Sequence, residues 1–278
     1  VMTPRFHALR ITDIRKETSD TVSIAFDVPS TLKNDFSFMA GQYLTLKTKI
    51  GGEEIRRSYS LCSAPFESEW RVAIKQVNQG IFSTYANNEL KIGDVLDVMT
   101  PAGNFFLKPD SKTTKNYVLF AAGSGITPIL SISKTILKEE PTGRITLFYG
   151  NKNFSSIIFR EAIEALKNTY MDRIRIIHVL SRESLGNQIQ KGRIDQEKCT
   201  NLFNAFLKNE PIDAVYICGP QDMIMGVKDC LQEQGVDSKS IHFELFNTAT
   251  QKGIEKNDGL SDLAESIESN VSIILDGD

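Results

Sequence analysis

The stretch NYVLFAAGSGITP, residues 116–128, is the clearest indication of fold class in this sequence. The apolar run at 116–123 is predicted to be a strand, and the segment 128–140 behind the two glycines has the spacing of a helix. A strand followed by a glycine turn and a helix is the building unit of α/β folds. The stretch therefore predicts an α/β domain in this part of the chain.

The alternation of strands and helices continues toward the C-terminus. Further apolar strands are predicted at 144–150, 173–181 and 214–219, and helices at 159–170, 199–209 and 222–235. Strands that alternate with helices predict a doubly wound parallel sheet. Such a sheet binds ligands at the carboxyl ends of its strands, so the residues just after each strand are the candidates for function.

The N-terminal part of the chain has a different pattern. Short runs rich in β-branched and aromatic residues predict strands at 21–28, 42–48, 57–63, 70–77 and 94–101, with one short helix at 83–90. Turn signals that contain glycine separate these strands, which favours a small antiparallel barrel or sandwich. We expect a β-barrel domain at 1–110, an α/β domain at 111–247 and an acidic tail at 248–278.

Composition excludes several classes of protein. The 278 residues are 41% hydrophobic and 24% charged with a net charge of −3, which is typical of a soluble globular protein and not of a nucleic-acid binder. No run of eighteen apolar residues predicts a membrane span, and the N-terminus lacks the apolar core of a signal peptide. The four cysteines show no C-x-x-C spacing, so we expect no metal site in this chain and a reducing, cytoplasmic compartment.

The glycine-rich loop has two interpretations. It reads G-x-G-x-x-P, a variant of the dinucleotide fingerprint, and consists of Gly123, Ser124, Gly125, Ile126, Thr127 and Pro128. Its glycines would let backbone amides approach a pyrophosphate, while the following helix N-terminus favours negative charge and proline suits a first helical turn. The alternative is a turn that only allows tight packing of the strand against the helix.

A second motif, RRSYSLCSAP, lies at 56–65 in the first domain. Its alternation is compatible with an ordinary half-buried strand that begins with an exposed arginine pair. The functional interpretation is that an arginine fork and nearby hydroxyls bind a phosphate, while a tyrosine lies flat against a ring system. The motif alone does not decide between them.

Polar groups follow the strand predicted at 173–181. Ser181 and Arg182 stand at its carboxyl end, where a hydroxyl and an arginine would suit the 2′-phosphate of NADP. Arg193 is a second candidate for the same phosphate. The alternative is that Arg182 is a solvated surface arginine.

A cysteine ends the strand predicted at 214–219. Cys218 stands beside Gly219 and Pro220, at a sharp turn where a ligand would lie. A buried cysteine usually behaves as a small hydrophobic residue. No Cys-His-Asp pattern indicates nucleophilic catalysis, so we expect Cys218 to serve packing and positioning.

Taken together, the motifs resemble those of the ferredoxin–NADP reductase superfamily. The family's flavin motif R-x-Y-S is similar to RSYS at 57–60, and its second flavin segment is similar to GIFST at 80–84. Its nucleotide loop and its C-G-P strand end resemble 123–128 and 218–220. Its E-x-aromatic near the C-terminus resembles ELF at 244–246. All five occur in the family's order.

This resemblance implies which residues bind the cofactors. Those implied for FAD are Arg57, Ser58, Tyr59, Ser60, Ile74, Lys75, Gly80, Phe82, Ser83, Thr84 and Phe246. Those implied for NADP are the loop 123–128, Ser181, Arg182, Arg193, Cys218, Gly219 and Pro220. Within these sets, the resemblance implies that Arg57 pairs with the FAD pyrophosphate and that Tyr59 lies along the flavin.

The residues implied in hydride transfer are Ser60, Cys218, Glu244 and Phe246. By the same resemblance, Ser60 lies near flavin N5, and Phe246 covers the flavin face that nicotinamide must reach. Glu244 would tune the charge of that pocket. The implied protein is an FAD-dependent oxidoreductase that takes a hydride from NADPH and passes single electrons to an iron–sulfur acceptor. A free-flavin reductase and a non-catalytic flavin- and nucleotide-binding module are the alternatives.

Within the superfamily, the segments 80–105, 178–183 and 192–195 are similar to the reductase components of phenylacetyl-CoA oxygenases and related three-part reductases. That subgroup implies a ferredoxin-type or oxygenase electron acceptor. It carries a plant-type [2Fe–2S] domain, whose C-x4-C-x2-C spacing the four cysteines here do not match. We therefore expect VSIILDGD at 271–278 to be the first strand of that domain, with the rest lacking; the alternative is a natural acidic tail.

Overall fold

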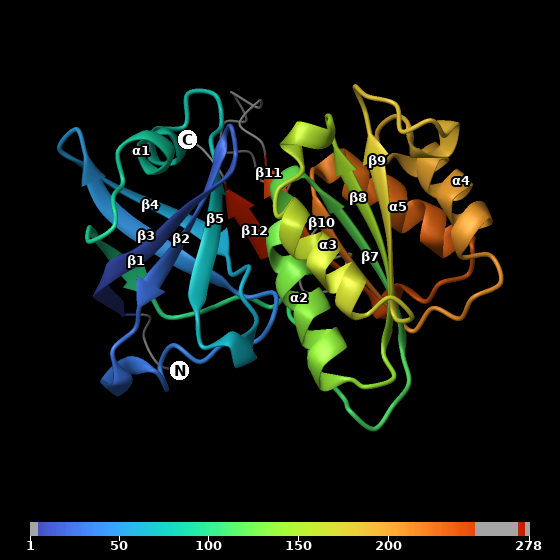
Figure 1. Cartoon of the computed structure of the whole chain (residues 1–278), viewed down its shortest axis with the longest axis horizontal. Coiled ribbons are helices and arrows are strands. Elements are labelled where there is room, and N and C mark those ends of the chain that lie inside the picture. Colours follow the sequence, from blue (N-terminus) through green and yellow to red (C-terminus); the bar gives the residue numbers. More distant parts are fainter. Residues whose placement is uncertain (1–4, 248–271, 276–278) are drawn as a thin grey trace, which may run out of the picture.

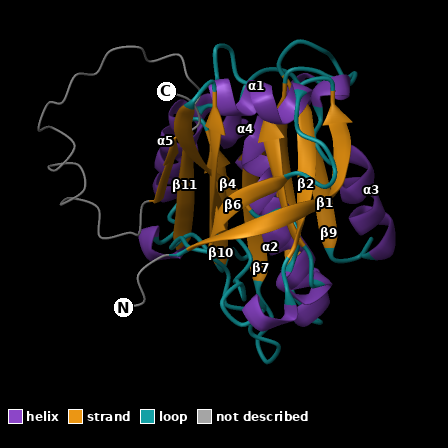
Figure 2. Cartoon of the chain, turned by 90° about the vertical axis from the view of Figure 1, so that its left-hand side faces the viewer, coloured by secondary structure: helices purple, strands orange, loops and turns teal. Residues whose placement is uncertain are grey.

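The computed structural model describes residues 5–247 and 272–275. Two sheets organise the chain, as Figure 1 shows: strands β1 to β6 form the first lobe, and β7 to β12 form the second together with four of the helices. Figure 2, turned by 90°, faces the first lobe, with the helices of the second behind its strands. The functional candidates therefore come from two different architectures.

The first sheet is antiparallel throughout. Its strands are β1 (Phe6–Thr18), β2 (Thr21–Asp27), β3 (Tyr43–Ile50), β4 (Glu53–Ser60), β5 (Trp70–Lys75) and β6 (Val95–Met99), in the order β4-β3-β6-β1-β2-β5. A bridge between Leu61 and Val72 joins the two ends, and the Cys62 amide donates to the Arg71 carbonyl at 2.9 Å. This closure confirms the predicted antiparallel barrel.

Strand β1 is the element that the residue pattern missed in this domain. Of its thirteen residues only Leu9, Ile11 and Thr18 are buried, and charged side chains occupy many of the remaining positions. A strand recognised by apolar runs alone is lost when one face is so polar. The short helix α1 (Ile81–Asn88), in contrast, was predicted, and it packs Phe82 and Ala86 into the barrel core.

The second sheet is parallel throughout, which confirms the predicted doubly wound domain. Its strands are β7 (Asn116–Ala122), β8 (Arg144–Asn151), β9 (Ile174–Leu180), β10 (Ala214–Gly219), β11 (Ile241–Asn247) and β12 (Ser272–Leu275), in the order β12-β11-β10-β7-β8-β9. Helices α2 (Ile126–Glu139) and α3 (Arg160–Thr169) pack on one face, and α4 (Gln196–Phe206) and α5 (Gln221–Glu233) on the other.

The strand order of this sheet reverses direction once. From β7 the chain moves outward to β8 and β9, and then returns to place β10 on the other side of β7. The carboxyl ends of β7 and β10 therefore border a topological switch point, where open α/β sheets bind ligands. The glycine-rich loop follows β7, and Gly219 and Pro220 stand at the end of β10.

The strand predicted in the tail has a partner in the structure. β12 pairs in parallel with β11, with Glu244 opposite Ser272, and extends the sheet by one strand. The residues 248–271 and 276–278 lie outside the described part of the chain. Membership of β12 in a further domain therefore stays a prediction.

Both lobes contribute to one apolar cluster. Ala40, Cys62 and Ala73 of the barrel pack together with Ile126 and Phe246 of the second domain. Burial of apolar surface is the dominant favourable term in such contacts, so the cluster holds the two domains against each other. None of the helices within the described residues has the length and apolar character needed to cross a membrane.

Candidate active site at the contact of the two domains

Ser60 and Glu244 meet across the domain boundary. Ser60 is the last residue of β4, Glu244 lies in the middle of β11, and 184 positions separate them in the sequence. The Ser60 hydroxyl donates to Oε2 of Glu244 at 3.3 Å, and both side chains are buried. The Oε1 atom of Glu244 is buried without a hydrogen-bond partner among the described residues. The structure thus unites two of the predicted catalytic residues.

Glu244 holds its proton more tightly than an ordinary glutamate. Burial raises its pKa to about 8, and the hydrogen bond from Ser60 offsets part of this increase. Cys218 stands opposite Glu244 in the β10–β11 register. Burial, and then the charge of Glu244, raise the pKa of the Cys218 thiol well above its usual range. A thiol so held is not a nucleophile, which agrees with the predicted positioning role.

The two glycines of the loop serve different purposes. A methyl group on Gly125 would overlap the carbonyl oxygen of Cys218, so Gly125 allows the loop to pack directly on the end of β10. Gly123 has a φ of +54°, in the left-handed region that favours glycine. The nearest atom to a methyl group there would be Lys75 Nζ, at 3.9 Å. The packing interpretation therefore accounts for Gly125, whereas the space beside Gly123 suits a ligand.

The remaining loop residues make the helix start. The Thr127 hydroxyl donates to the Ser124 carbonyl at 3.0 Å, and Ile126 begins α2. Pro128 lies within the first turn of that helix, where a missing amide proton costs no hydrogen bond. The Ile126 amide donates to the Gly123 and Ser124 carbonyls, because a short 3-10 turn at Gly123–Gly125 leads directly into α2. Amides at the start of a helical segment have no partner within it and carry partial positive charge, so the amides of this turn, and not that of Ile126, are the ones suited to a pyrophosphate.

Lys75 lies between the two domains. It ends β5, beside the buried Ile74, and its Nζ is 3.8 Å from Asp20 of its own domain. The same Nζ faces the Gly123 position of the second domain, as the distance above shows. The structure thus brings a predicted flavin-side residue to the predicted nucleotide loop.

The RSYS motif occupies the end of β4. Arg57 is half-buried, and its guanidinium donates to the Arg56 carbonyl at 2.8 Å. Ser58 shares a hydrogen bond of 2.8 Å with Thr45 of β3. Tyr59 is only 5% exposed, and its ring centroid lies 5.7 Å from that of Phe82 in the barrel core. Burial does not alternate along the motif, because Arg57 and Ser58 are both half-buried and Tyr59 and Ser60 are both buried. The predicted flavin contacts of Arg57 and Tyr59 stay predictions.

The GIFST segment forms the N-cap and the first turn of α1. The Ser83 hydroxyl accepts from the Val77 amide at 3.2 Å and donates to the Gly80 carbonyl at 3.3 Å. The Thr84 amide also donates to the Gly80 carbonyl, at 3.0 Å. Ser83 thus stabilises the turn through its own hydroxyl, and the amides of the first turn remain the groups that would meet a phosphate.

A separate group lies at the carboxyl end of β9. The Gly192 amide donates to the Leu180 carbonyl at 2.9 Å, which brings the segment with Arg193 beside Ser181 and Arg182. Both arginines are exposed, and neither forms an ion pair with any described residue. The carboxylate of Glu183 accepts from the Phe154 amide at 2.7 Å. The strand end therefore presents two arginines and a hydroxyl.

Two tyrosines of the site were missed. The buried Tyr149 of β8 donates through its hydroxyl to the Gly123 carbonyl at 3.1 Å and so anchors the loop. Burial, and then Glu244, raise the pKa of Tyr43 of β3. Tyr149 lies near the carboxyl end of its strand, where functional residues were expected. It was missed because its neighbours in the sequence are apolar, a pattern that indicates a residue of the core. No pattern in the sequence pairs Tyr43 with Glu244.

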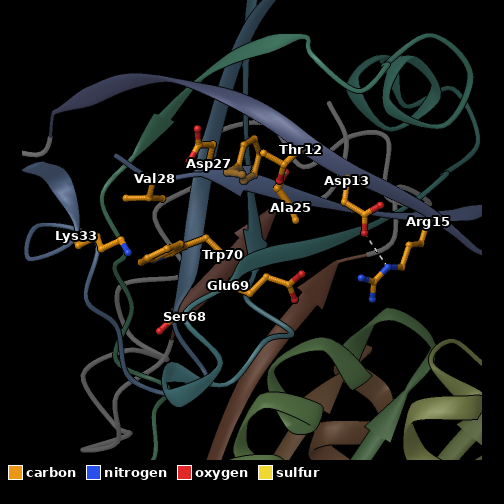
Figure 3. Close-up of a pocket in the computed structure, with 11 residues that line it drawn as sticks. Thr12, Asp13, Arg15, Ala25, Asp27, Val28, Lys33, Ser68, Glu69 and Trp70 are labelled. Carbon is orange, nitrogen blue, oxygen red and sulfur yellow. Dashed lines mark hydrogen bonds and ion pairs between the residues drawn. The ribbon is translucent and has the colours of Figure 1, made fainter. Parts of the chain in front are cut away.

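Two cavities of the described part of the chain lie apart from this site. Figure 3 shows one of about 630 Å³ in the first domain, where Thr12, Asp27, Lys33 and Trp70 are among its lining residues. Arg15 and Asp13, at its edge, form an ion pair of 2.7 Å. None of the predicted site residues lines this cavity. Within the described residues, no group of three or more His, Cys, Asp or Glu side chains is placed to hold a metal ion.

Comparison with known protein families matches both lobes. A family of oxidoreductase FAD-binding domains matches residues 8–107, and a family of oxidoreductase NAD-binding domains matches residues 119–229. The first match contains Ser60 and the RSYS motif, and the second contains the glycine loop and Cys218. Glu244 and Phe246, on β11, lie beyond both matched ranges.

Curated relatives cover most of the chain. A component of the 1,2-phenylacetyl-CoA epoxidase of Escherichia coli is 40% identical over 243 residues, which are 87% of this chain and 68% of that protein. The ferredoxin reductase component of the 3-ketosteroid-9-alpha-monooxygenase of Rhodococcus rhodochrous is 31% identical, over 97% of this chain and 74% of that protein.

Solved structures share the fold. A ferredoxin NADP+ reductase from Neisseria gonorrhoeae with bound FAD and NADP superimposes with a TM-score of 0.73 at 22% identity, over 87% of this chain and 98% of that one. The flavohem-like FAD/NAD-binding domain of a Vibrio cholerae nitric oxide dioxygenase gives 0.73 at 26% identity, over 87% and 99%. Barrel and parallel sheet thus have the same arrangement in these proteins.

The buried carboxyl predicts a pH dependence of stability. Glu244 has a folded pKa of about 8 against a reference of 4.5, so its contribution is full below pH 4.5 and is lost as pH rises toward 8. We expect wild-type stability to fall relative to Glu244→Gln across this window, by up to about 1.4 kcal/mol per pH unit. Urea unfolding of both proteins from pH 5 to pH 9 measures this, with the exposed Glu53→Gln as control. A difference between wild type and Glu244→Gln that does not change with pH would contradict the assignment.

The packing role of Gly125 predicts a loss of stability. In Gly125→Ala the added methyl group meets the Cys218 carbonyl, so the backbone must shift, at a cost of about 1–3 kcal/mol. Gly150→Ala is the matched control, because its nearest neighbour is the flexible Ile194 side chain, with Cδ1 at 3.3 Å. Thermal and urea unfolding compare the two variants. Equal stabilities would show that the loop does not depend on this contact.

Proposed function

The chain belongs to the ferredoxin–NADP reductase superfamily of FAD- and NAD-binding oxidoreductases, and from this premise we propose that it oxidises NADPH and supplies single electrons to an iron–sulfur acceptor. The chain is thus a flavoprotein reductase by family. What we propose beyond the family is the choice of NADPH over NADH, the nature of the electron acceptor and the roles of the individual residues. We also propose the domain boundaries 1–110, 111–247 and 248–278.

The observation that carries the proposal is the meeting of Ser60, Cys218 and Glu244 at the domain contact. Ser60 comes from the FAD-binding half, and Cys218 and Glu244 come from the second domain. The unpartnered, buried Oε1 of Glu244 fits a site that is completed by a ligand. A contact that served packing alone would not require a buried carboxyl group, because removing such a group from water costs free energy.

These residues fit an FAD-dependent reaction. When bound, FAD supplies a ring that accepts a hydride and releases electrons one at a time. Ser60 would lie near its reacting edge, with its hydroxyl oriented by Glu244. With a pKa of about 8, Glu244 retains its proton at pH 7, so no carboxylate charge opposes the anionic nucleotide there. Phe246, only 8% exposed within the shared cluster, would help to exclude water.

The residues of the second domain would hold the nucleotide. The loop 123–128 would bind the pyrophosphate through its amides, with Lys75 adding a positive charge from the first domain. Gly125 and Cys218 keep this loop against β10, next to Gly219 and Pro220. The position of the nicotinamide relative to the flavin would then depend on how the two domains are docked. Correct alignment of two reacting groups supplies much of the rate of a reaction.

The carboxyl end of β9 supports NADPH over NADH. NAD-binding sites of this sheet type use a carboxylate at a strand end to accept from the ribose 2′-hydroxyl. Glu183, the carboxylate beside this strand end, is already engaged by the Phe154 amide. Arg182, Arg193 and Ser181 offer the donors that a 2′-phosphate requires.

The acceptor is proposed from the relatives. The Rhodococcus relative is named as the ferredoxin reductase component of a monooxygenase, and the Escherichia coli relative as one component of an epoxidase. We therefore propose that this chain serves as the reductase component of an oxygenase system. The four free, buried cysteines support a reducing cytoplasm.

The overall proposal is tested by anaerobic reduction. Purified FAD-loaded protein should lose its flavin absorption on addition of NADPH, and turnover with ferricyanide, a small one-electron acceptor, should follow. In a separate anaerobic assay without ferricyanide, an iron–sulfur ferredoxin should be reduced by NADPH only when this protein is present. If FAD leaves the protein on gel filtration and is reduced free in solution, the chain is a free-flavin reductase. If no nucleotide bleaches the bound flavin, it is a non-catalytic binding module.

Nucleotide choice gives a sharper prediction. Arg182→Ala should raise the KM for NADPH by about ten- to a hundredfold, because one charged hydrogen bond contributes about 1.5–3 kcal/mol. The KM for NADH should stay nearly unchanged. Arg144→Ala is the matched control, since that exposed arginine begins β8 at the opposite end of the sheet. Equal responses of both nucleotides to Arg182→Ala would remove this residue from 2′-phosphate recognition.

A further inference from the structure

A second buried hydrogen bond joins the two domains close to the end of β4. The hydroxyl of Ser131, in α2, donates to the carbonyl of Ser63 at 2.7 Å. Both residues are at most 1% exposed. Ser63 follows Ser60 by three positions, and Ser131 lies one helical turn beyond Thr127 of the glycine loop. The bond therefore connects the exit of the flavin strand to the start of the nucleotide helix.

The other hydroxyls of this part of α2 behave differently. Ser133 donates to the Ile129 carbonyl at 2.7 Å, and Thr135 donates to the Ser131 carbonyl at 2.9 Å. Both are back-bonds to the residue four positions earlier, which is the ordinary choice of a buried serine or threonine inside a helix. Ser131 instead directs its donor to the neighbouring domain.

The acceptor of this bond is itself held firmly. The Ser63 hydroxyl donates to the Glu69 carbonyl at 2.7 Å and accepts from the Arg71 amide at 3.1 Å. The buried Arg71 is in turn bound to Asp13 and Glu69. A movement of Ser131 relative to Ser63 would therefore act on the barrel wall and not on a flexible loop.

An ion pair lies next to the bond. Lys134, one turn further along α2, places Nζ 2.9 Å and 3.0 Å from the two carboxylate oxygens of Glu67. Glu67 also accepts from the Ala64 amide at 2.6 Å. A cavity of about 400 Å³, lined by Ser63, Glu67 and Lys134 among others, adjoins these groups. The side chains of the ion pair are partly exposed, whereas the serine bond is buried.

We propose that Ser131 is a positioning residue that sets the approach of the nucleotide to the flavin. It does so through its hydrogen bond to the Ser63 carbonyl. This bond joins two short segments: one runs back from Ser131 to the glycine loop, and the other runs back from Ser63 to Ser60. Together with the Ser60–Glu244 contact, it fixes the exit of β4 to the second domain at two points. This inference rests on the proposed NADPH oxidation. A misplacement of about 1 Å at a reacting centre can lower a rate by a hundredfold.

The test compares Ser131→Ala with Ser133→Ala. The two serines are similarly buried on the same helix, but only Ser131 crosses the domain boundary. In Ser131→Ala we expect the rate of flavin reduction at saturating NADPH to fall by about tenfold or more, with the KM nearly unchanged. Ser133→Ala should reduce flavin at the wild-type rate.

A second readout is independent of turnover. Hydrogen exchange of the backbone amides in peptides covering 61–67 and 128–134, measured with and without FAD, should accelerate in Ser131→Ala and not in Ser133→Ala. If wild type reduces flavin while Ser131→Ala matches it in both exchange and rate, the positioning role is wrong. If NADPH does not reduce wild-type flavin, the proposed function fails, and the exchange result alone still decides whether the bond holds the domains.

Should Ser131→Ala not fold, Ser131→Cys replaces it, because a thiol fills a similar volume but is only a weak hydrogen-bond donor. Faster exchange at 61–67 and slower flavin reduction in Ser131→Cys would support the proposal, because the bond to the Ser63 carbonyl is weakened. Exchange and rate at the wild-type level would overturn it.

Discussion

A carboxyl group that is fully buried where two domains touch is the constraint on which this molecule depends. Glu244 cannot face water, so it must find a donor from the barrel and hold a proton. Ser60 provides the donor only if the barrel docks with the end of β4 against β11. The apolar cluster supplies most of the attraction between the domains, and this polar contact selects one orientation among many that would bury similar area.

The loop and the strand end show that packing and ligand binding are not competing explanations. Position 125 requires glycine because the loop packs directly on the Cys218 carbonyl. Position 123 favours glycine because its backbone is left-handed, and the space beside it is open. Tyr149 then holds the Gly123 carbonyl in place. A rigid support for a short loop keeps its amides aimed in one direction, which lowers the ordering cost when an anion binds.

Periodicity and composition predicted most of this fold. The parallel sheet followed from apolar strands alternating with helices, and its ligand edge followed from strand ends alone. Strand β1 was not predicted, because its few buried residues are interspersed with charged ones and form no apolar run. The union of Ser60, Cys218 and Glu244 came from family resemblance, since no local pattern relates residues so far apart. Tyr43, Tyr149 and Ser131 were missed because a hydroxyl among apolar neighbours is ambiguous until its partner is known.

The long sequence separation of the site has a consequence for synthesis of the protein. Ser60 leaves the ribosome 184 residues before its partner Glu244. The barrel is complete only when β6 ends at Met99. At about 5–20 residues per second, roughly 7–30 s then pass in which the barrel can fold while its wall at β4 still lacks the second domain. During that interval the apolar residues of the future contact face solvent or a chaperone. A mutation that slows docking would then appear first as low yield of protein, before any change in its chemistry.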